Sequence, residues 1–430
     1  MKKITLKLLF LLVGLVLTGC NNLSTNVPDL NQTNTGKPPI TVENIPEPTP
    51  LETKVEYLIN DQIPQGNIED VLEESGVLGE TAYFDFENGL ITFLGFDKNR
   101  NLIMIEDGTT FDLVSIPKEG KKKVLFENVM GDRKREINNA VFQEPFVVWS
   151  ECPNARTIPN PTKGADWAVY MLNIQTKELT LIDYDQGLRV DQKYPNPYLC
   201  PKDMDIDGDY IVYPGFANND KGIIVQVVKT YQISTKEIKI IGELKSDPFY
   251  NSLGTPSIYG NFITWPEAFF RKDGLYEGFC ILYNIDTGES RKIMTPDNVI
   301  NPTLTNGYLV ASSQPNKTFY DAEVVVLDLS DLTWKLKVNS NLSIYSKHDR
   351  NPFSITGCID TMCAWYASSP DTDALAILDI EQQLLYTIIG KEEGHTVNYP
   401  MLRPGKVLTW YEHVMTENGL KPKLYYHHIK

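Results

Sequence analysis

Tryptophan and glutamate recur two positions apart in three segments that lie far from one another in the sequence. The pairs are Trp149 with Glu151, Trp265 with Glu267, and Trp410 with Glu412. Residues two apart in an extended strand lie on the same face, so each pair places an aromatic ring beside a carboxylate. Such rings and carboxylates suit a surface that binds glycans or cations, and paired carboxylates are also the groups that hydrolyse glycosidic bonds.

The same pattern also fits a purely structural role, in which each tryptophan fills space between neighbouring sheets and each glutamate pairs with a basic residue. Other aromatic and charged residues adjoin two of the pairs and extend the ligand-binding interpretation. The candidates for a ligand face are Trp149, Glu151, Trp265, Glu267, Phe269, Phe270, Arg271, Trp410, Tyr411 and Glu412. The sequence does not give the separation of the carboxylates, so packing, ligand binding and catalysis all stay open, and no catalytic residue is assigned.

An aspartate-rich segment resembles the first half of a calcium-binding loop. Asp203, Asp205 and Asp207 alternate with apolar residues and are followed by Gly208. The acid that such a loop needs at its twelfth position is replaced by Pro214. We therefore predict a tight turn at Asp207-Gly208, keep the three aspartates as weak candidates for a metal, and predict no cofactor.

The cysteines offer two disulfide candidates. Cys152 and Cys200 lie in segments predicted as loops on the same side of adjacent units, and Cys358 and Cys363 flank a short segment that a hairpin would bring together. Free thiols are an equally open interpretation, because no spacing here identifies the connectivity. The usual sequence templates for a serine nucleophile, a zinc protease, a phosphate loop or a dinucleotide site are missing.

A repeated segment positions these residues. It consists of a Pro or Asn, a short apolar strand, a turn that often contains Gly, and a second strand that ends in most copies in an aromatic residue. The copies end at positions 105, 149, 213, 265, 312, 365 and 410, roughly every 50 residues. A second hairpin follows each copy, most clearly in Ile281–Ile293. Each unit therefore has four antiparallel strands.

Repeated four-stranded units predict an all-β fold, a seven-bladed β-propeller, with six or eight blades as alternatives. A pair of β-sandwiches would not predict similar units in series. The last unit stops at Ile429, one strand short, and a strand-like segment at Val55–Ile59 begins the folded region. We expect these two segments to pair and so to close the ring of blades.

These repeats resemble those of TolB-like propellers and, more loosely, of WD-repeat and YWTD-type propellers, over residues 54–430. The chain departs from the TolB-type repeat, which has Ser-Pro-Asp-Gly between its first two strands, since only Asp207-Gly208 approaches that motif. The resemblance implies a propeller scaffold. It does not imply one activity, because such scaffolds serve as binding proteins and as enzymes.

The N-terminus indicates where the protein is located. Lys2, Lys3 and Lys7 flank or precede an apolar run from Leu8 to Leu17, which is too short to span a bilayer. The run continues into Thr18-Gly19-Cys20 and resembles a bacterial lipoprotein signal, which implies cleavage before Cys20 and attachment of acyl chains such as palmitate to that cysteine. Six prolines then fall within residues 21–53, typical of a flexible tether.

These observations divide the chain into a signal peptide (1–19), a lipidated cysteine with a disordered tether (20–53), and the propeller (54–430). Lys and Arg number 40 against 56 Asp and Glu, a net charge of −16, which argues against nucleic acid as a partner. In a propeller, the loops after second strands and before first strands meet on one face, and here they are the long ones. They are predicted to include Cys152–Asp166, Pro214–Gly222, Pro266–Gly278 and Tyr411–Lys423.

We therefore predict a monomeric, extracytoplasmic lipoprotein, anchored to the bacterial cell membrane through Cys20, that binds an envelope protein or a glycan with its loop-rich face. A propeller hydrolase or lyase acting on carbohydrate or peptide is one alternative, and the residues favour binding over catalysis. A purely structural part of an envelope complex is the other alternative.

Overall fold

A computed structural model describes the fold over the segments that carry the strands. The described residues are 49–50, 65–66, 91–107, 111–117, 121–127, 129, 135–153, 167–184, 201, 203–218, 224–243, 251–270, 276–293, 298–314, 323–339, 355–368, 373–389, 396–403, 407–416 and 419–428. The chain divides into Met1–Thr41 and a compact unit, Val42–Lys430, which contains all of them. Over these segments the secondary structure is β-strand, and no helix there is long and apolar enough to cross a membrane.

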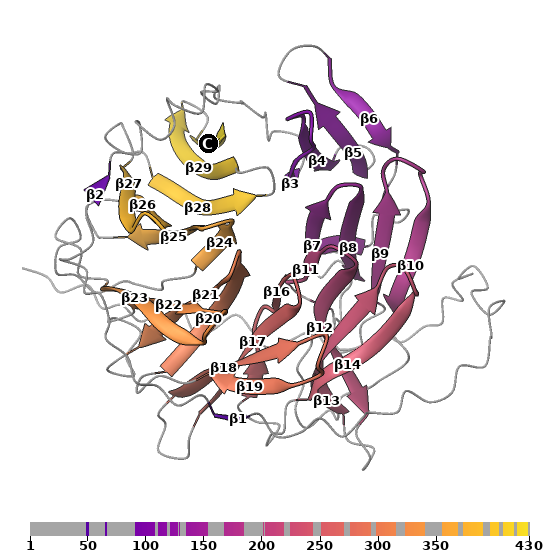
Figure 1. The fold of residues 1–430 in the computed structure, drawn as a ribbon. Helices are drawn as coiled ribbons and strands as arrows, with labels where there is room; N and C mark the ends of the chain where they lie inside the picture. Colours follow the sequence, from indigo (N-terminus) through magenta and orange to yellow (C-terminus); the bar gives the residue numbers. More distant parts are fainter. Residues whose placement is uncertain are drawn as a thin grey trace, which may run out of the picture. The chain divides into compact units, whose positions relative to one another are not determined.

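The described strands form seven sheets in chain order (Figure 1). The first contains β3 (Ile91–Phe96), β4 (Leu102–Asp107), β5 (Phe111–Ile116) and β6 (Lys123–Phe126). The second contains β7 (Arg135–Gln143), β8 (Phe146–Pro153), β9 (Ala168–Asn173) and β10 (Leu179–Tyr184). The third contains β11 (Asp205–Asp207), β12 (Tyr210–Asn218), β13 (Ile224–Gln232) and β14 (Glu237–Glu243).

The later sheets repeat this order with small variations. The fourth contains β15 (Asn251–Leu253) and β16 (Ser257–Tyr259), which both pair with β17 (Phe262–Phe270), then β18 (Tyr276–Asn284) and β19 (Ser290–Ile293). The fifth contains β20 (Asn298–Thr305), β21 (Tyr308–Gln314), β22 (Glu323–Asp328) and β23 (Thr333–Asn339). The sixth contains β24 (Ile355–Ile359), β25 (Met362–Ser368), β26 (Asp373–Asp379) and β27 (Leu384–Ile389).

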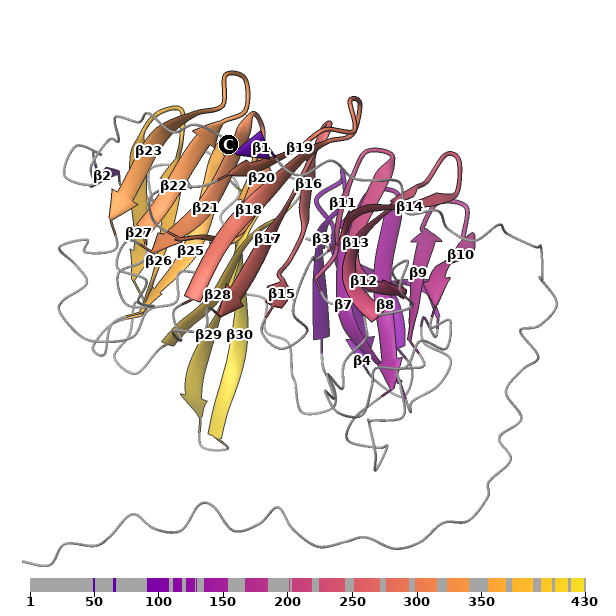
Figure 2. The same cartoon turned by 90° about the horizontal axis from the view of Figure 1, so that it is seen from below.

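The seventh sheet contains β28 (Thr396–Arg403), β29 (Val407–Thr416) and β30 (Gly419–His428), whose long hairpin is visible in Figure 2. The predicted all-β fold of repeated four-stranded antiparallel units is confirmed. Val55–Ile59, predicted to complete the last unit, lies outside the described residues.

Two short N-terminal strands pair elsewhere. β1 (Thr49–Pro50) pairs in parallel with β19 of the fourth sheet, and β2 (Gln65–Gly66) pairs in parallel with β27 of the sixth. Both add to the last strand of a four-stranded unit. β1 lies within the segment predicted as a tether, so the chain already contacts the propeller a few residues before the predicted boundary at residue 54.

The core is divided into packed layers between successive sheets. Each of seven clusters of buried apolar residues in the described segments combines side chains from two neighbouring sheets. One cluster joins Val407 of the seventh sheet to Met104 and Val114 of the first. β28 also contacts β3. The seven sheets thus close on themselves, and each added sheet contributes one more layer instead of thickening a single core.

Two ends of each sheet differ in their connections. At the end that we name the turn end, strand one joins strand two and strand three joins strand four, through tight turns where the connection is described, for example at 208–209 and 233–236. Gly208 occupies such a turn with φ of +55°, a left-handed conformation that favours glycine, and open space surrounds it. The turn predicted at Asp207-Gly208 is therefore present. At the opposite end, the loop end, strands two and three are joined and the chain passes to the next sheet.

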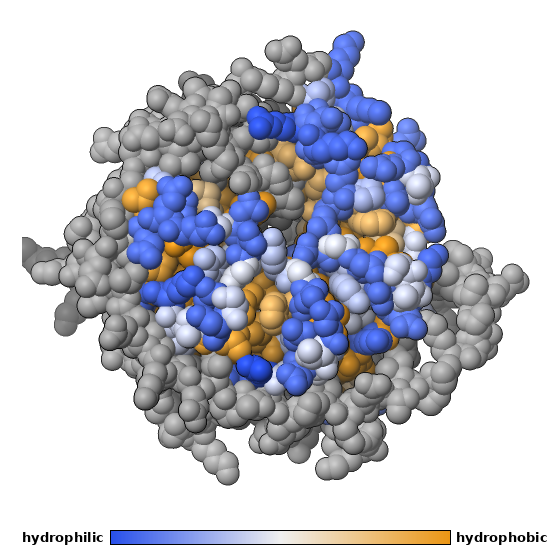
Figure 3. All heavy atoms as spheres, viewed as in Figure 1, coloured by the Kyte–Doolittle hydropathy of each residue, from blue (hydrophilic) through white to orange (hydrophobic). Residues whose placement is uncertain are grey.

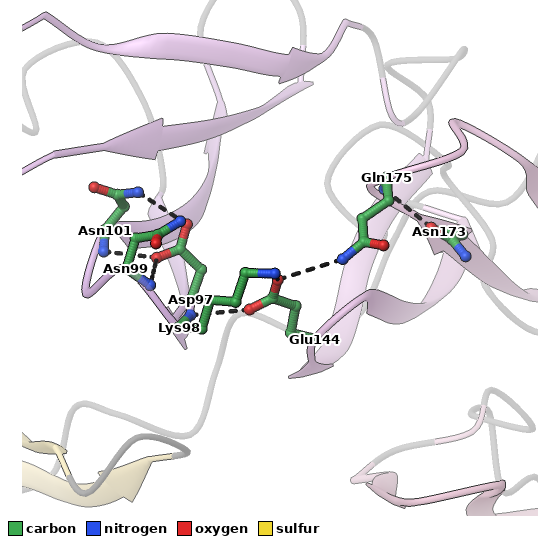
Figure 4. A network of polar contacts seen from close by, with 7 residues as sticks. All are labelled: Asp97, Lys98, Asn99, Asn101, Glu144, Asn173 and Gln175. Carbon is green, nitrogen blue, oxygen red and sulfur yellow. Dashed lines mark hydrogen bonds and ion pairs between the residues drawn. The ribbon is translucent and has the colours of Figure 1, made fainter.

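The turn ends of the first two sheets contact each other through polar groups (Figure 4). The Lys98 N–H donates to Glu144 Oε2 over 2.9 Å, and Lys98 Nζ lies 3.4 Å from Glu144 Oε1. Gln175 Nε2 donates to the same carboxylate at 3.4 Å. Exposed contacts of this kind contribute little to stability, so they align the turns and the apolar layers hold the sheets together.

Several segments predicted as loops are strands. β17 continues to Phe270, β12 continues to Asn218, and residues 411–423 largely form the β29–β30 hairpin. The backbone hydrogen-bonding pattern runs on beyond the repeat position, with Phe269 paired to Glu277. The loop end is therefore built partly from projecting strand ends.

Candidate functional site

Trp149 lies in the layer between the first and second sheets. It sits on β8, is completely buried, and packs in one cluster with Ile105 and Leu113 of the first sheet. Its ring stacks on Tyr170 with centroids 5.6 Å apart. The indole Nε1 donates to Glu151 Oε1 over 3.0 Å, and the Glu151 side chain is itself buried. The pair forms one hydrogen-bonded unit inside the protein.

Trp265 repeats this arrangement between the third and fourth sheets. Its Nε1 donates to Glu267 Oε1 over 3.2 Å. The ring packs against Gly242 of β14 so closely that a Cβ at this glycine would lie 2.6 Å from Cζ2 of the indole. Gly242 is therefore required by close approach, because any side chain there would displace the ring.

Trp410 is buried between the sixth and seventh sheets, in one cluster with Ala364 and Ile377. The three indoles thus lie in packed layers, and a ligand surface formed by these rings does not fit their burial. Of the other ligand-face candidates, Phe269 and Phe270 are the last residues of β17, and Tyr411 and Glu412 belong to β29. The side chains of these four residues, and all of Arg271, lie outside the described part of the structure.

A fourth tryptophan occupies the same repeat position without a partner. Trp365 of β25 is completely buried between the fifth and sixth sheets, and its Nε1 has no hydrogen-bond partner. The residue two positions later is Ala367, where the other three segments have glutamate. The repeat alignment contains this difference, but only the structure shows that the indole N–H is left unsatisfied.

A buried ion pair that no sequence pattern indicates joins the second and third sheets. Lys229 Nζ lies 2.8 Å from Asp183 Oδ2, and both side chains are buried. The Tyr213 hydroxyl donates to the same oxygen over 3.1 Å. Burial, together with the negative charge of Asp183, raises the pKa of Tyr213 well above its usual value. These three residues form a neutral network in an apolar layer, with no exposed reactive group.

The environment of Lys229 explains two neighbouring residues. Its ammonium lies 5.8 Å from the ring centroid of Trp167, and a Cβ at Gly215 would lie 3.1 Å from the Lys229 side chain. Asp183 and Lys229 are far apart in the sequence and carry no motif, so no sequence signal identifies the pair in advance.

Asp205 and Asp207 lie in β11, and Asp203 precedes this strand. All three carboxylates accept hydrogen bonds from neighbouring sheets, Asp203 Oδ1 from Asn139 Nδ2 at 3.5 Å. Asp205 Oδ2 accepts from Ser257 Oγ at 3.0 Å and from the Ile258 N–H at 2.9 Å. Asp207 accepts from Gln143 Nε2 on the second sheet and from the Gly260 N–H on the fourth. These acids therefore connect three successive sheets. Over the described residues, no group of three or more potential ligands is arranged to hold a metal ion.

Asp205 is half-buried and held by these hydrogen bonds. Loss of solvation raises its pKa to about 6, although the donors from Ile258, Ile206 and Ser257 act in the opposite direction. Its neighbour Asp207 adds a smaller increase through charge repulsion. The carboxyl group at this inter-sheet contact therefore titrates above the normal range for an aspartate.

The cysteines divide into two classes. Cys152 is disulfide-bonded. Its predicted partner Cys200 lies outside the described residues, while the adjoining Pro201 carbonyl accepts a 2.9 Å hydrogen bond from Ser150 of β8. Cys358 and Cys363, candidates for a disulfide, are instead free thiols directly opposite each other in β24 and β25. The hairpin brings them together as predicted, but they interact through a thiol hydrogen bond that, with burial, raises the pKa of Cys358.

Comparisons with known proteins bear on the fold. No protein-family model matches the sequence, and no curated protein matches it. Among solved structures, a prolyl endopeptidase is similar over 85% of this chain and 53% of its own, with 11% identity and a TM-score of 0.53. The chain thus spans about half the length of that enzyme (53%).

Two further structures are similar. An oligogalacturonate lyase solved in complex with manganese matches over 82% of this chain and 97% of its own, with 11% identity and a TM-score of 0.50. TolB from Acinetobacter baumannii matches over 73% of this chain and 66% of its own, with 11% identity and a TM-score of 0.38. At 11% identity, the similarities to the endopeptidase and the lyase bear on the fold alone, in agreement with the propeller that the seven sheets form, and they leave the activity open.

Proposed function

We propose that the protein is a membrane-anchored extracytoplasmic lipoprotein whose propeller binds an envelope protein or a glycan through its loop end. Cys20 is the acylated residue in this proposal, and the bilayer is the first partner. Two or more acyl chains hold a protein stably on a membrane surface. The acidic body, with −16 net charge for the whole chain, does not bind anionic lipid by itself.

The observation that supports a binding role is that the buried polar groups interact with one another inside the propeller. The Trp149–Glu151 pair, the Asp183–Lys229 pair and the aspartates of β11 all make contacts that hold sheets together. These groups are thus committed to the scaffold. The loop end carries the long connections between strands and sheets, and connections on a rigid scaffold are where recognition is commonly located.

Site-specific photo-crosslinking tests this proposal. A benzoylphenylalanine replaces Phe269 at the loop end of β17, and a matched control variant carries it at the exposed Thr235 in the β13–β14 turn. We expect an envelope protein or glycan to be captured through position 269 and not through 235. Capture through Thr235 alone, or equally through both positions, would argue against a loop-end site.

The anchor is tested separately. Metabolic labelling with a palmitate analogue is expected to label the chain, and Cys20→Ala is expected to remove the label and release the protein from membranes. Pull-down with Val42–Lys430, a compact unit that keeps β1, then identifies partners independently of the lipid.

Catalysis is the alternative function. The similar prolyl endopeptidase and oligogalacturonate lyase show that the fold is compatible with peptide and carbohydrate enzymes. Glu267 is the acid to test, because it is less buried than Glu151. Turnover of a peptide or oligosaccharide that Glu267→Gln abolishes, in a variant that still folds, would favour this alternative. The third possibility, a structural part of an envelope complex, predicts a stable partner and no soluble ligand.

A further inference from the structure

A cavity of about 450 Å³ lies at the turn end, between the fourth and fifth sheets. It is lined by the start of β17, the β18–β19 hairpin and the β22–β23 turn. Its volume is within the range of small-molecule sites. This position is opposite to the loop end, so the cavity is independent of the function proposed above.

The floor of the cavity is apolar and firmly packed. Leu282 and Leu329 are buried, and Phe262 and Leu332 are partly buried against the same cluster. This cluster is the layer between the two sheets, so its side chains are held in place by both. Figure 3 shows that hydrophobic residues are also visible between hydrophilic ones on the face of the molecule seen there. The floor suits an aliphatic side chain.

The walls carry charges of both signs. Arg291 and Glu289 line the cavity from the fourth sheet, and Asp331 lines it from the fifth. Among the described residues, neither Arg291 nor Glu289 forms an ion pair. Asp331 Oδ1 accepts hydrogen bonds from the Thr333 N–H and hydroxyl, which fix its orientation. A guanidinium on one wall and a carboxylate on the other complement a ligand that carries both charges.

One buried polar group without a partner belongs to the apolar layer under this lining. Trp334 packs in the same cluster as Leu282 and Leu329, and its Nε1 has no hydrogen-bond partner. The Ser290 hydroxyl is also buried without a partner, but Ser290 is paired with Tyr283 on the face of the fourth sheet that packs against the third sheet, so it does not bear on this cavity. Unpaired buried groups are costly, and they are found where a ligand or an ordered water completes the hydrogen bonding.

From this arrangement we infer that the cavity binds a short peptide with free termini and an aliphatic side chain. Arg291 binds the carboxylate of the peptide, Asp331 on the opposite wall binds its ammonium group, and the apolar floor receives the side chain. No bond is made or broken, and the site is a binding site that requires no other group.

Calorimetry on the full chain in detergent tests this inference with the dipeptide Leu-Leu and with its doubly blocked form, N-acetyl-Leu-Leu amide. We expect the free dipeptide to bind at least about tenfold more tightly than the blocked form, because only the free form carries the two charges. Arg291→Gln is expected to weaken binding by about tenfold or more, and Asp331→Asn to do the same from the other wall.

The matched control is Lys239→Gln, which removes an exposed charge from β14. β14 is the last strand of the third sheet, as β19, which carries Arg291, is the last strand of the fourth. It should leave binding within about twofold of the wild type. Circular dichroism of each variant checks the fold, and Asp331→Asn keeps the acceptor for Thr333. No binding up to about 10 mM, equal binding of the blocked dipeptide, or binding unchanged by both wall variants would each overturn the inference.

Discussion

The layers around Trp149 and Trp365 contain the same residue at the same repeat position, but they treat its polar atom differently. Both indoles are fully buried between two sheets. Trp149 donates to Glu151, whereas the N–H of Trp365 has no partner and the corresponding position holds Ala367. The indole ring therefore recurs in the repeat because it fills space between two sheets. The carboxylate is not needed for that packing, and where it is present it accepts a hydrogen bond from the buried N–H.

Replacing each indole by phenylalanine is the most direct way to break this comparison. Trp149→Phe removes a hydrogen bond to a buried carboxylate, so we expect a loss of about 3–4 kcal/mol in the free energy of unfolding. Trp365→Phe removes no hydrogen bond, and we expect a loss of about 1–2 kcal/mol from the smaller volume. Urea unfolding of both variants measures the difference, and equal losses would show that the Trp149–Glu151 bond adds nothing.

Asp205 extends the comparison to a half-buried acid, whose hydrogen-bond donors do not fully replace the water that it loses on folding. Its pKa of about 6 lies above the ordinary value of about 3.9, so the folded state binds the proton more tightly than the unfolded state. Stability from this group is therefore present below pH 4 and is lost as the pH rises through 6, by about 3 kcal/mol.

The variant Asp205→Asn keeps the side-chain shape and an acceptor but does not titrate. We expect the free energy of unfolding of this variant not to show the decrease between pH 4 and 7 that Asp205 causes in the wild type. The stability of the variant relative to the wild type should therefore increase as the pH rises. Unfolding curves at several pH values measure both proteins. Parallel pH profiles for the two would contradict the assignment of the raised pKa to Asp205.

Removing the Glu151 carboxylate makes the environment of Trp149 resemble that of Trp365. Glu151→Ala should leave the Trp149 N–H buried without its acceptor, as in Trp365, at a cost of about 1–3 kcal/mol in stability. Glu151→Gln keeps an acceptor oxygen and should lose less. If the two variants unfold at the same urea concentration, the carboxylate does not act through this hydrogen bond.

Adding a carboxylate is the smallest expected effect. Ala367→Glu places an acceptor two positions after Trp365, on the same face of the strand, and we expect a gain of about 0.5–1 kcal/mol in stability. The control is the same substitution in a Trp365→Phe background, where the gain should vanish. A double-mutant cycle measures the coupling, and a gain that persists without the indole would have another cause.

The repeat pattern was sufficient to predict the strands, because strand alternation and turn residues are local properties. It predicted the turn at Gly208, the hairpin in which Cys358 lies opposite Cys363, and the first two strands of most units. It also placed Trp149 and Glu151 side by side, since residues two apart on one strand are neighbours in any sheet.

The loop boundaries were less predictable. Phe269 and Phe270 follow Pro266, which usually marks the end of a strand, yet β17 continues through them because its ladder with β18 continues. The ladder depends on a partner strand, and the residues of β17 alone do not reveal where it ends.

By itself, the sequence determined the elements of this protein, which are four-stranded units in series. The signal peptide at 1–19 and the membrane anchor at Cys20 stay predictions. Only the tertiary structure decided which polar groups meet. Asp183 reaches Lys229, and Asp205 reaches Ser257, across the layers between sheets. Such partners are distant in the chain, and their meeting depends on how the sheets pack, so a local pattern does not contain it.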